Sequence, residues 1–343
     1  MWHLTPPSPN LIKWYKDTML KGLIDRILKN KDLPNSVKEI LLPHWFPYRD
    51  YRDTSILEQL LTAGPEQSKQ LNDKLMEQIK VVPEVYFGLS LVRNIDKILE
   101  KTFAYDTEIS GNKGRAYQLT HEQGRYTCTY CNRSYALTVV RRDTEQPLFP
   151  GFKRTNDTNR IARPHLDHWF DKAKNPLLSL NIFNLIPSCP ICNSSVKGTE
   201  HYSLSTHIHP YLYDKAEPPF RFVISPNDKS QRFPFVVRIN ELLCDDKERK
   251  MIESLALNEV YSYHGMLEAK DILDWSIENS PEYLHELFRN LSAKYKRTTE
   301  EVFRMFFGTE YVPEKNLDRP LSKLKRDILI QIGLLDNDGN FIA

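Results

Sequence analysis

The sequence predicts an α+β protein in which mostly helical N- and C-terminal regions flank a turn-rich centre held by zinc. Apolar residues recur at helical spacing through about the first hundred residues and again towards the C-terminus. Between about residues 120 and 215 that periodicity is lost, and this stretch holds four of the five cysteines and six of the ten histidines. Two short alternating runs then indicate strands. We therefore expect three regions, at residues 1–115, 116–215 and 216–343.

Composition excludes several classes of protein. The chain has 343 residues, of which 40% are hydrophobic, so it can bury a substantial core. Its 47 Lys and Arg residues nearly balance 45 Asp and Glu residues, which argues against intrinsic disorder and against a uniformly basic nucleic-acid coat. No apolar run approaches the ~20 residues of a membrane helix, and the N-terminus lacks an apolar signal core. We therefore expect a cytoplasmic protein that would bind nucleic acid through a local patch.

The N-terminal region is predicted as a series of helices. Apolar spacing over residues 12–28 predicts the first helix, which the segment around Pro34 ends. A proline-rich connector over residues 42–48 precedes two short helices, at 55–61 and 66–80. Pro83 starts or kinks the next helix, which runs through Leu99, and the sequence ISGNKG at 109–114 predicts a loop.

The C-terminal region begins with strands and returns to helices. Alternating and apolar runs predict strands at 220–224 and 233–239. Ser280-Pro281 opens a helix, and Thr298 with Glu301 forms a capping box for another that ends at Gly308.

A last helix follows over residues 321–332, and three of its basic residues are expected on a solvated face, with a DNA-binding patch as the alternative: Lys323, Lys325 and Arg326. The lone Cys244 has no partner spacing and is expected to be structural.

Four of the five cysteines form two C-x-x-C pairs, Cys128 with Cys131 and Cys189 with Cys192. In a chain without a secretory signal, this pairing favours a metal site over disulfides. Two such turns complete a tetrahedral zinc site, and four thiolates leave no open position for chemistry. We therefore expect a structural Zn²⁺ that joins two distant turns. The alternative is two unrelated pairs of buried cysteines.

Between the cysteine pairs lies an adjacent acid and imidazole, Asp167-His168. A carboxylate is a hard ligand for Mg²⁺ or Mn²⁺, and a neutral histidine can take a proton from water. The pair suits phosphodiester hydrolysis, although alone it is more often an ordinary surface pair. Three polar residues around the second cysteine pair favour hydrolysis: Asn184 begins a short apolar strand, Asn193 directly follows the last cysteine, and Lys197 lies one helical turn later.

With these motifs in this order, the centre resembles the HNH endonucleases (the ββα-metal or His-Me finger family) in their zinc-stapled branch. The resemblance covers about residues 125–212. It implies a zinc-stapled ββα-metal core in which His168 is the general base and Asp167 and Asn193 hold one catalytic Mg²⁺ or Mn²⁺. In the same family the middle asparagine, here Asn184, ties the two strands together.

The chain departs from the family pattern at three places. Its last motif residue is Asn193, where histidine is frequent, and Asp171 stands where many relatives have proline. A long polar insertion over residues 141–163 separates the first cysteine pair from the hairpin and leaves the strand boundaries open. None of these departures removes a group that the chemistry needs.

Further residues around the motif are candidate contacts to phosphate or nucleic acid. For each of them an ordinary role in packing or on the solvated surface is the alternative. These candidates are Lys197, Arg133, Arg163, His165 and His209.

The function expected from these residues is a metal-dependent endonuclease, with DNA favoured over RNA. The motif style also resembles the HNH nucleases of bacterial anti-phage operons of the Septu type, which implies antiviral defence beside an ATPase partner from the same operon. The competing interpretation is a zinc-stapled module that binds nucleic acid or protein without cutting, within a larger complex. The near-zero net charge is consistent with a partner that supplies affinity.

Overall fold

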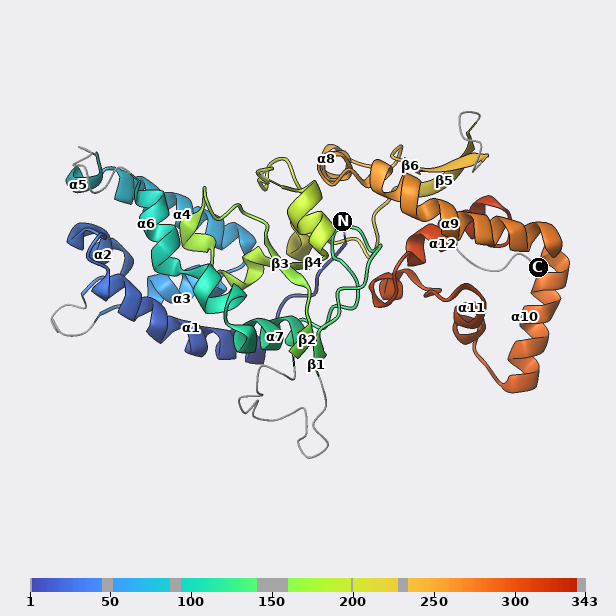
Figure 1. Ribbon diagram of the computed structural model, residues 1–343, viewed down its shortest axis with the longest axis horizontal. Helices are drawn as coiled ribbons and strands as arrows, with labels where there is room; N and C mark the ends of the chain where they lie inside the picture. The colour runs from blue at the N-terminus through green and yellow to red at the C-terminus, as the bar shows by residue number, and fades with distance from the viewer. Residues whose placement is uncertain are drawn as a thin grey trace.

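The computed structural model describes residues 2–44, 52–86, 94–140, 160–198, 200–227 and 234–337. It is an elongated, mostly helical α+β structure in which helices at both ends flank small antiparallel hairpins (Figure 1). Most of the polar insertion expected at 141–163 lies outside the described residues, as do parts of the 42–48 connector. Within the described part of the chain, no helix is long and apolar enough to cross a membrane.

The N-terminal end is helical, as predicted, but the helix expected from Pro83 through Leu99 is not continuous. Residues 87–93 lie outside the described residues, and Asn94 has a non-helical φ of −145° and caps a separate helix that begins at Ile95. Helix α1 begins after Ser8, whose hydroxyl accepts a hydrogen bond from the Leu11 amide. The helix buries one apolar stripe, formed by every fourth residue from Leu11 to Ile27. The elements are α1 (Pro9–Lys29), α2 (Asn35–Leu41), α3 (Ser55–Thr62), α4 (Pro65–Lys80), α5 (Pro83–Tyr86), α6 (Ile95–Phe103), η1 (Asp106–Ser110) and α7 (Lys113–Glu122).

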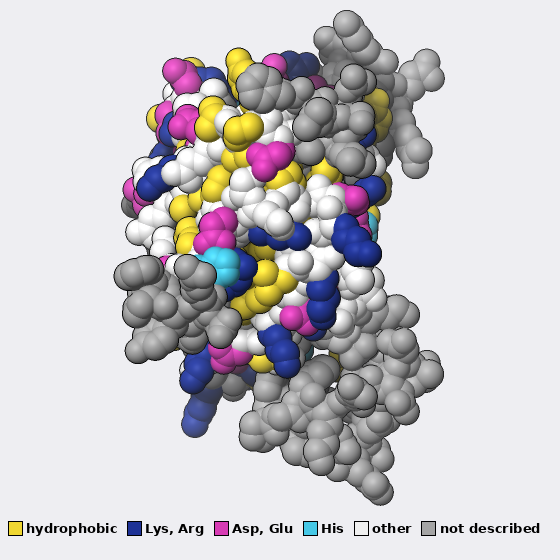
Figure 2. Space-filling model, turned by 90° about the vertical axis from the view of Figure 1, so that its left-hand side faces the viewer, with side chains coloured by type: hydrophobic (Ala, Val, Ile, Leu, Met, Phe, Trp, Pro, Cys, Tyr) yellow, Lys and Arg dark blue, Asp and Glu magenta, His cyan; other side chains and the backbone are white. Residues whose placement is uncertain are grey.

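The loop predicted at 109–114 is shorter than expected. Its first residues end the π-helical turn η1, and Asn112 caps α7 by accepting a hydrogen bond from the Arg115 amide at 3.2 Å. Helix α7 therefore crosses residue 115, where the sequence placed the end of the helical region. On the face in Figure 2, which shows this end of the molecule, basic and acidic side chains are interspersed with apolar ones.

Within the described residues, three two-stranded antiparallel hairpins follow in chain order. The first pairs β1 (Val139–Val140) with β2 (Arg160–Ala162), and the last pairs β5 (Arg221–Pro226) with β6 (Phe235–Asn240). The central one pairs β3 (His165–His168) with β4 (Leu185–Ser188), with His165 opposite Ser188 and His168 opposite Leu185. Short helical turns accompany it: η3 (Pro176–Leu178), η4 (Ile182–Asn184), η5 (Ile191–Val196) and η6 (Pro210–Leu212).

The central hairpin is fixed to the N-terminal helices by buried hydrogen bonds. The Tyr15 hydroxyl of α1 donates to the Leu180 carbonyl at 2.8 Å. The Asn181 amide donates to the carbonyls of Leu60 and Ala63 at the end of α3, at 2.9 and 3.0 Å. Because these bonds join segments more than a hundred residues apart, they hold the helical end and the centre in one core.

The C-terminal end is built from α8 (Asp246–Ser254), α9 (Leu257–Glu278), α10 (Pro281–Tyr295), α11 (Thr299–Phe307), η7 (Pro313–Asp318) and α12 (Ser322–Gln331). The predicted capping box of Thr298 and Glu301 is confirmed, and Gly308 ends α11 with a left-handed φ of 62°. Such a φ strains residues with a Cβ, which explains the glycine. Cys244 is buried, as expected, and burial raises its pKa to about 11.

The expectation that the basic residues of the last helix lie on a solvated face is wrong for two of them. Lys323 and Arg326 are buried, because β5, α9 and η7 all pack on α12. The Lys323 ammonium lies 3.0 Å from an Asp327 carboxylate oxygen, and Arg326 pairs with Glu217. These basic residues form buried ion pairs, as buried charges generally must.

Candidate metal centre and catalytic site

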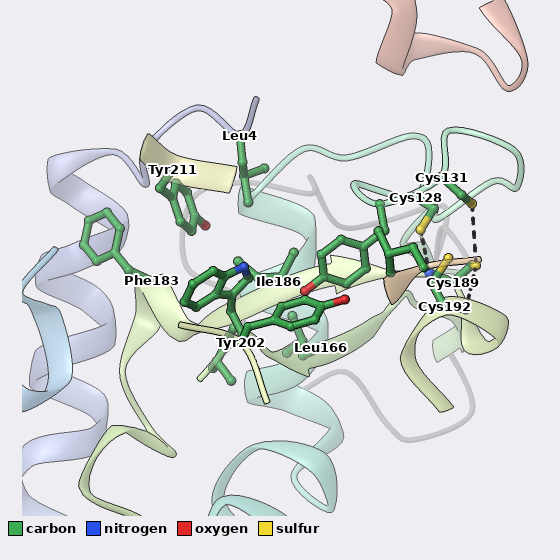
Figure 3. Close-up of a cluster of buried hydrophobic side chains, with 14 of the residues drawn as sticks. Leu4, Cys128, Cys131, Leu166, Phe183, Ile186, Cys189, Cys192, Tyr202 and Tyr211 are labelled. Carbon is green, nitrogen blue, oxygen red and sulfur yellow. Dashed lines mark hydrogen bonds between the residues drawn. The ribbon is translucent and has the colours of Figure 1, made fainter. Parts of the chain in front are cut away.

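The four cysteines of the two C-x-x-C pairs meet at one buried point. Their sulfur atoms all lie within 4.8 Å of one another, and they gather beside a cluster of buried apolar residues (Figure 3). The sulfurs of Cys131 and Cys189 are 4.0 Å apart. A tetrahedral Zn²⁺ with Zn–S bonds of about 2.3 Å would place its sulfurs about 3.8 Å apart. The predicted four-cysteine cluster is confirmed, and its geometry is consistent with a structural Zn²⁺.

Backbone amides around this cluster point at the sulfurs. The Cys189 amide donates to Cys128 Sγ at 3.2 Å, and the Arg133 amide donates to Cys131 Sγ at 3.4 Å. Such donors stabilise thiolates, whereas burial raises the pKa of the Cys128 thiol well above its usual range. A buried cation would supply the charge that four thiolates need, so the donor set fits zinc.

The zinc turns are also anchored to the C-terminal end. The Tyr261 hydroxyl of α9 donates to the Cys131 carbonyl, and the Asn132 side-chain amide donates to the Asn316 carbonyl of η7 at 2.7 Å. The Leu321 amide donates to the Asn132 carbonyl at 2.8 Å. The cysteine cluster therefore lies where the hairpin and the C-terminal helices meet.

Next to the central hairpin lies an open cavity of about 650 Å³. Its walls come from β3, from the segment that follows β3, from η5, and from the end of the N-terminal helical region. Six of the site residues proposed from the sequence line it together: Arg163, His165, Asp167, His168, Asn193 and Lys197. This juxtaposition makes the cavity the candidate catalytic site.

A hydrogen bond determines which ring nitrogen of His168, at the end of β3, carries the proton. Its Nε2 lies 2.9 Å from the Ser179 carbonyl oxygen, which can only accept, so Nε2 carries the proton and Nδ1 keeps a lone pair. The Tyr105 ring packs edge-on against the imidazole, with centroids 4.2 Å apart. Burial lowers the His168 pKa to about 4, so the ring is neutral near pH 7. A neutral imidazole with a defined lone pair can act as a base.

Asp167 is buried in a network of short hydrogen bonds. Its Oδ2 accepts from the Tyr130 hydroxyl at 2.5 Å and from the Lys197 ammonium at 2.6 Å. Lys197 also donates to the His168 carbonyl and lies 4.7 Å from the centre of the Tyr202 ring. Lys197, predicted from sequence as a phosphate contact, thus has the Asp167 carboxylate as its ionic partner.

Asn184 fastens the segment after β3 onto the start of β4. Its Oδ1 accepts from the Phe170 amide at 2.6 Å, and its Nδ2 donates to the carbonyls of Phe170 and Leu178, both at 3.0 Å. The side chain is fully buried, so these three bonds replace the water that it loses. This fixes the segment that follows His168.

Asn193 on η5 and His165 on β3 face each other at the cavity. The Asn193 side-chain nitrogen lies 3.2 Å from His165 Nδ1. His165 and Asp167 are two residues apart on the same strand and so share a face. The carboxylate of Asp167 and the carboxamide of Asn193 are the two hard oxygen donors that the sequence placed at a divalent cation.

The other predicted phosphate contacts are divided between the cavity and the core. The Arg163 guanidinium lines the cavity and donates to the carbonyls of Pro164 and Ser110, at 3.0 and 3.4 Å. Arg133 is buried beside the zinc turn, and two of its guanidinium nitrogens have no hydrogen-bond partner among the described residues. His209 is buried against Trp169, with ring centroids 4.6 Å apart.

Sequence reasoning missed several residues at this site. His201 Nδ1 lies 2.7 Å from Asp171 Oδ2, and both residues line the cavity. Tyr130 supports Asp167, and Tyr105 packs on His168. The tyrosine inside the first cysteine pair could have been suspected from its place in the motif. The other contacts join segments far apart in sequence, and no local pattern predicts them.

Comparison with models of protein families, with curated proteins and with solved structures gives no match.

Proposed function

We propose that this chain is a metal-dependent HNH-type endonuclease that hydrolyses phosphodiester bonds in nucleic acid, with DNA favoured. The observation that carries the proposal is the state of His168. Its proton is held on Nε2 by the Ser179 carbonyl, so Nδ1 keeps a lone pair, and His168 lines a cavity that Asp167 and Asn193 also line. A neutral base beside two hard oxygen ligands suits hydrolysis of a phosphate ester.

The order of elements supports the same proposal. Strand β3 ends with the Asp167-His168 pair, Asn184 precedes the antiparallel strand β4, and Asn193 lies on the helical turn η5. The HNH resemblance implies a ββα-metal core. Such a core consists of two strands followed by a helical turn, with four cysteines that bind zinc beside them. The hydrogen bonds of Asn184 fit its expected role of tying the hairpin together.

The proposed catalytic cation is Mg²⁺ or Mn²⁺, with Asp167 and Asn193 as its protein ligands. Both recorded hydrogen bonds of the Asp167 carboxylate fall on Oδ2, and a carboxylate has acceptor capacity on two oxygens. The donor set of one carboxylate and one carboxamide fits a hard cation that keeps several waters. When bound, such a cation would supply charge stabilisation at the phosphate.

The chain's own residues would prepare the attacking water and hold the phosphate. His168 Nδ1 would accept the proton of the water, and the Ser179 carbonyl would hold the opposite N–H in place. Arg163 and Lys172 line the same cavity and would contribute positive charge near the phosphate. This cavity is therefore the proposed contact point for the nucleic-acid backbone.

A partner protein is part of the proposal. A chain with a formal net charge of +2 gains little affinity for nucleic acid from its overall charge. The resemblance to anti-phage HNH nucleases supports an ATPase partner encoded in the same operon and a cytoplasmic setting. That partner would supply affinity or the trigger for cleavage.

The experiment that tests the proposal incubates the purified protein with plasmid DNA and, separately, with RNA. Each reaction contains Mg²⁺, Mn²⁺ or a chelator, with and without the product of the neighbouring gene. Cleavage that requires the divalent cation supports the nuclease, and the better substrate decides between DNA and RNA. Binding without cleavage in every reaction would instead favour the non-catalytic zinc-stapled module.

A further inference from the structure

A second imidazole faces the same cavity as His168 and is held by its own carboxylate. His201 lies beyond η5, and its Nδ1 lies 2.7 Å from Asp171 Oδ2 in the segment after β3. A carboxylate only accepts, so the proton at this contact is on Nδ1, and Nε2 is the nitrogen that can meet a ligand in the cavity. The His201 side chain is 44% exposed, so a substrate can reach it.

The Asp171 side chain is itself fixed. Its Oδ1 accepts a hydrogen bond from the Ala173 amide at 2.9 Å, and its backbone carbonyl accepts from the amides of Lys174 and Asn175. The carboxylate therefore sits in a rigid turn and orients the His201 ring. The same segment is tied to β4 by Asn184, whose side chain bonds both backbone groups of Phe170. The segment after β3, which Asn184 holds in place, therefore directly follows His168 and carries the Asp171 partner of His201.

The two histidines differ in what supports them. His168 bonds a neutral carbonyl, which suits a base that begins the reaction without a proton. His201 donates to a carboxylate, an arrangement that suits a group that gives up a proton during the reaction. Phosphodiester hydrolysis needs both functions, because the attacking water loses a proton and the departing sugar oxygen gains one.

We propose that His201 is the general acid of the hydrolysis and that Asp171 positions it; this inference rests on the proposed nuclease function. His168 Nδ1 takes a proton from water as the water oxygen bonds to phosphorus. The bond from phosphorus to the leaving sugar oxygen breaks, its electron pair stays on that oxygen, and the oxygen takes the Nε2 proton of His201. His201 is left neutral, still donating Nδ1–H to Asp171, and regains its proton from solvent while His168 returns one.

The test compares two substrates that differ in their need for an acid. One is DNA, whose sugar alkoxide must be protonated as it leaves. The other is a p-nitrophenyl ester of thymidine monophosphate, whose nitrophenolate leaves without a proton. Cleavage rates are measured for the wild type and for His201→Gln, Asp171→Asn and His168→Ala, all at equal zinc content. His264→Gln is the matched control, because this exposed histidine lies on α9, away from the cavity.

We expect His201→Gln to lower DNA cleavage about 100-fold and to leave nitrophenyl ester cleavage within about threefold of wild type. Asp171→Asn should lower DNA cleavage about 10-fold with the same selectivity, since it loosens the ring without removing it. His168→Ala should lose activity on both substrates, and His264→Gln should lose neither.

Equal loss on both substrates for His201→Gln would mean a phosphate-binding or structural role and would overturn the inference, as would unchanged DNA cleavage. Failure of the nuclease proposal is a different result: the wild type would cleave neither substrate, with or without the product of the neighbouring gene. That result would refute both the nuclease proposal and the general-acid role of His201.

Discussion

The Lys197 ammonium lies 2.6 Å from Asp167 Oδ2, and neither side chain is more than 8% exposed. A buried ion pair of this kind adds little net stability when both partners are present, because each charge has lost its water. Removing one partner leaves the other charge buried and unpaired. The pair therefore couples the helical turn η5 to the end of β3, where His168 lies.

Substitution of Lys197 by methionine should destabilise the fold by about 3–5 kcal/mol, because it leaves the Asp167 carboxylate buried without its ionic partner. Urea denaturation of zinc-loaded protein measures this loss. The control is Lys29→Met, which removes the exposed Lys29–Asp25 pair on α1 and should change stability by less than about 0.5 kcal/mol. The double variant Lys197→Met with Asp167→Leu should be more stable than the single one. If the single variant is as stable as wild type, the buried pair is not formed.

One Zn²⁺ should bind each chain through the four clustered cysteines. Cys189→Ser should lose the metal and lower the thermal stability of the protein, since the site joins turns about sixty residues apart. Elemental analysis and thermal melts measure both effects. Cys244→Ser is the matched control, because Cys244 is also buried but lies outside the cluster. Equal zinc content in the two variants would exclude the proposed site.

Asn184→Ala should cost a few kcal/mol, since it leaves the backbone amide and carbonyl of Phe170 buried without their partner. Hydrogen exchange should show increased opening of the segment after β3. Asn316→Ala removes a different buried asparagine, in η7, and should leave that segment protected. Unchanged exchange after β3 in Asn184→Ala would contradict the anchoring role.

Stability should fall as the pH is lowered below about 6.5, in part because of His209. Burial lowers the His209 pKa to about 3 in the folded protein, whereas an unfolded histidine titrates near 6.5. Between these two values the unfolded state binds more protons, so the contribution of His209 is complete above about 6.5 and is lost as the pH falls towards 3. His209→Phe should reduce the dependence of unfolding free energy on pH in this range, by up to about 1.4 kcal/mol per pH unit. An identical dependence in both proteins would show that His209 titrates normally.

Much of the fold was predictable from local patterns. The capping box at Thr298, the breaks near Pro34 and Pro83 and the apolar stripe of α1 are confirmed because each depends on neighbouring residues alone. Lys323 and Arg326 were misplaced because their burial depends on elements that pack from elsewhere in the chain. The short interval between η1 and α7 was mistaken for a longer loop, because glycine and asparagine signal a turn without giving its length.

The candidate site likewise contains residues that short motifs predict and contacts that only the fold creates. The four cysteines and the Asp167-His168 pair stand in short motifs, so they could be predicted as site residues from the sequence alone. The ionic partner of Lys197 and the pairing of His201 with Asp171 join segments about thirty residues apart, and only the fold brings them together. The contact of Tyr105 with His168 likewise depends on the packing of the N-terminal helices against the hairpin.

The most direct test of the proposed function is the rate at which plasmid DNA is cut by the wild type and by His168→Ala at equal zinc content. Each is measured with Mg²⁺ or Mn²⁺, and with and without the product of the neighbouring gene. If His168 is the general base, the wild type should cut and the variant should be slower by about 10²–10⁴-fold, with its zinc site and fold intact. Equal rates for the two proteins would contradict the assignment of His168 and place any cleavage at another site or in a contaminant.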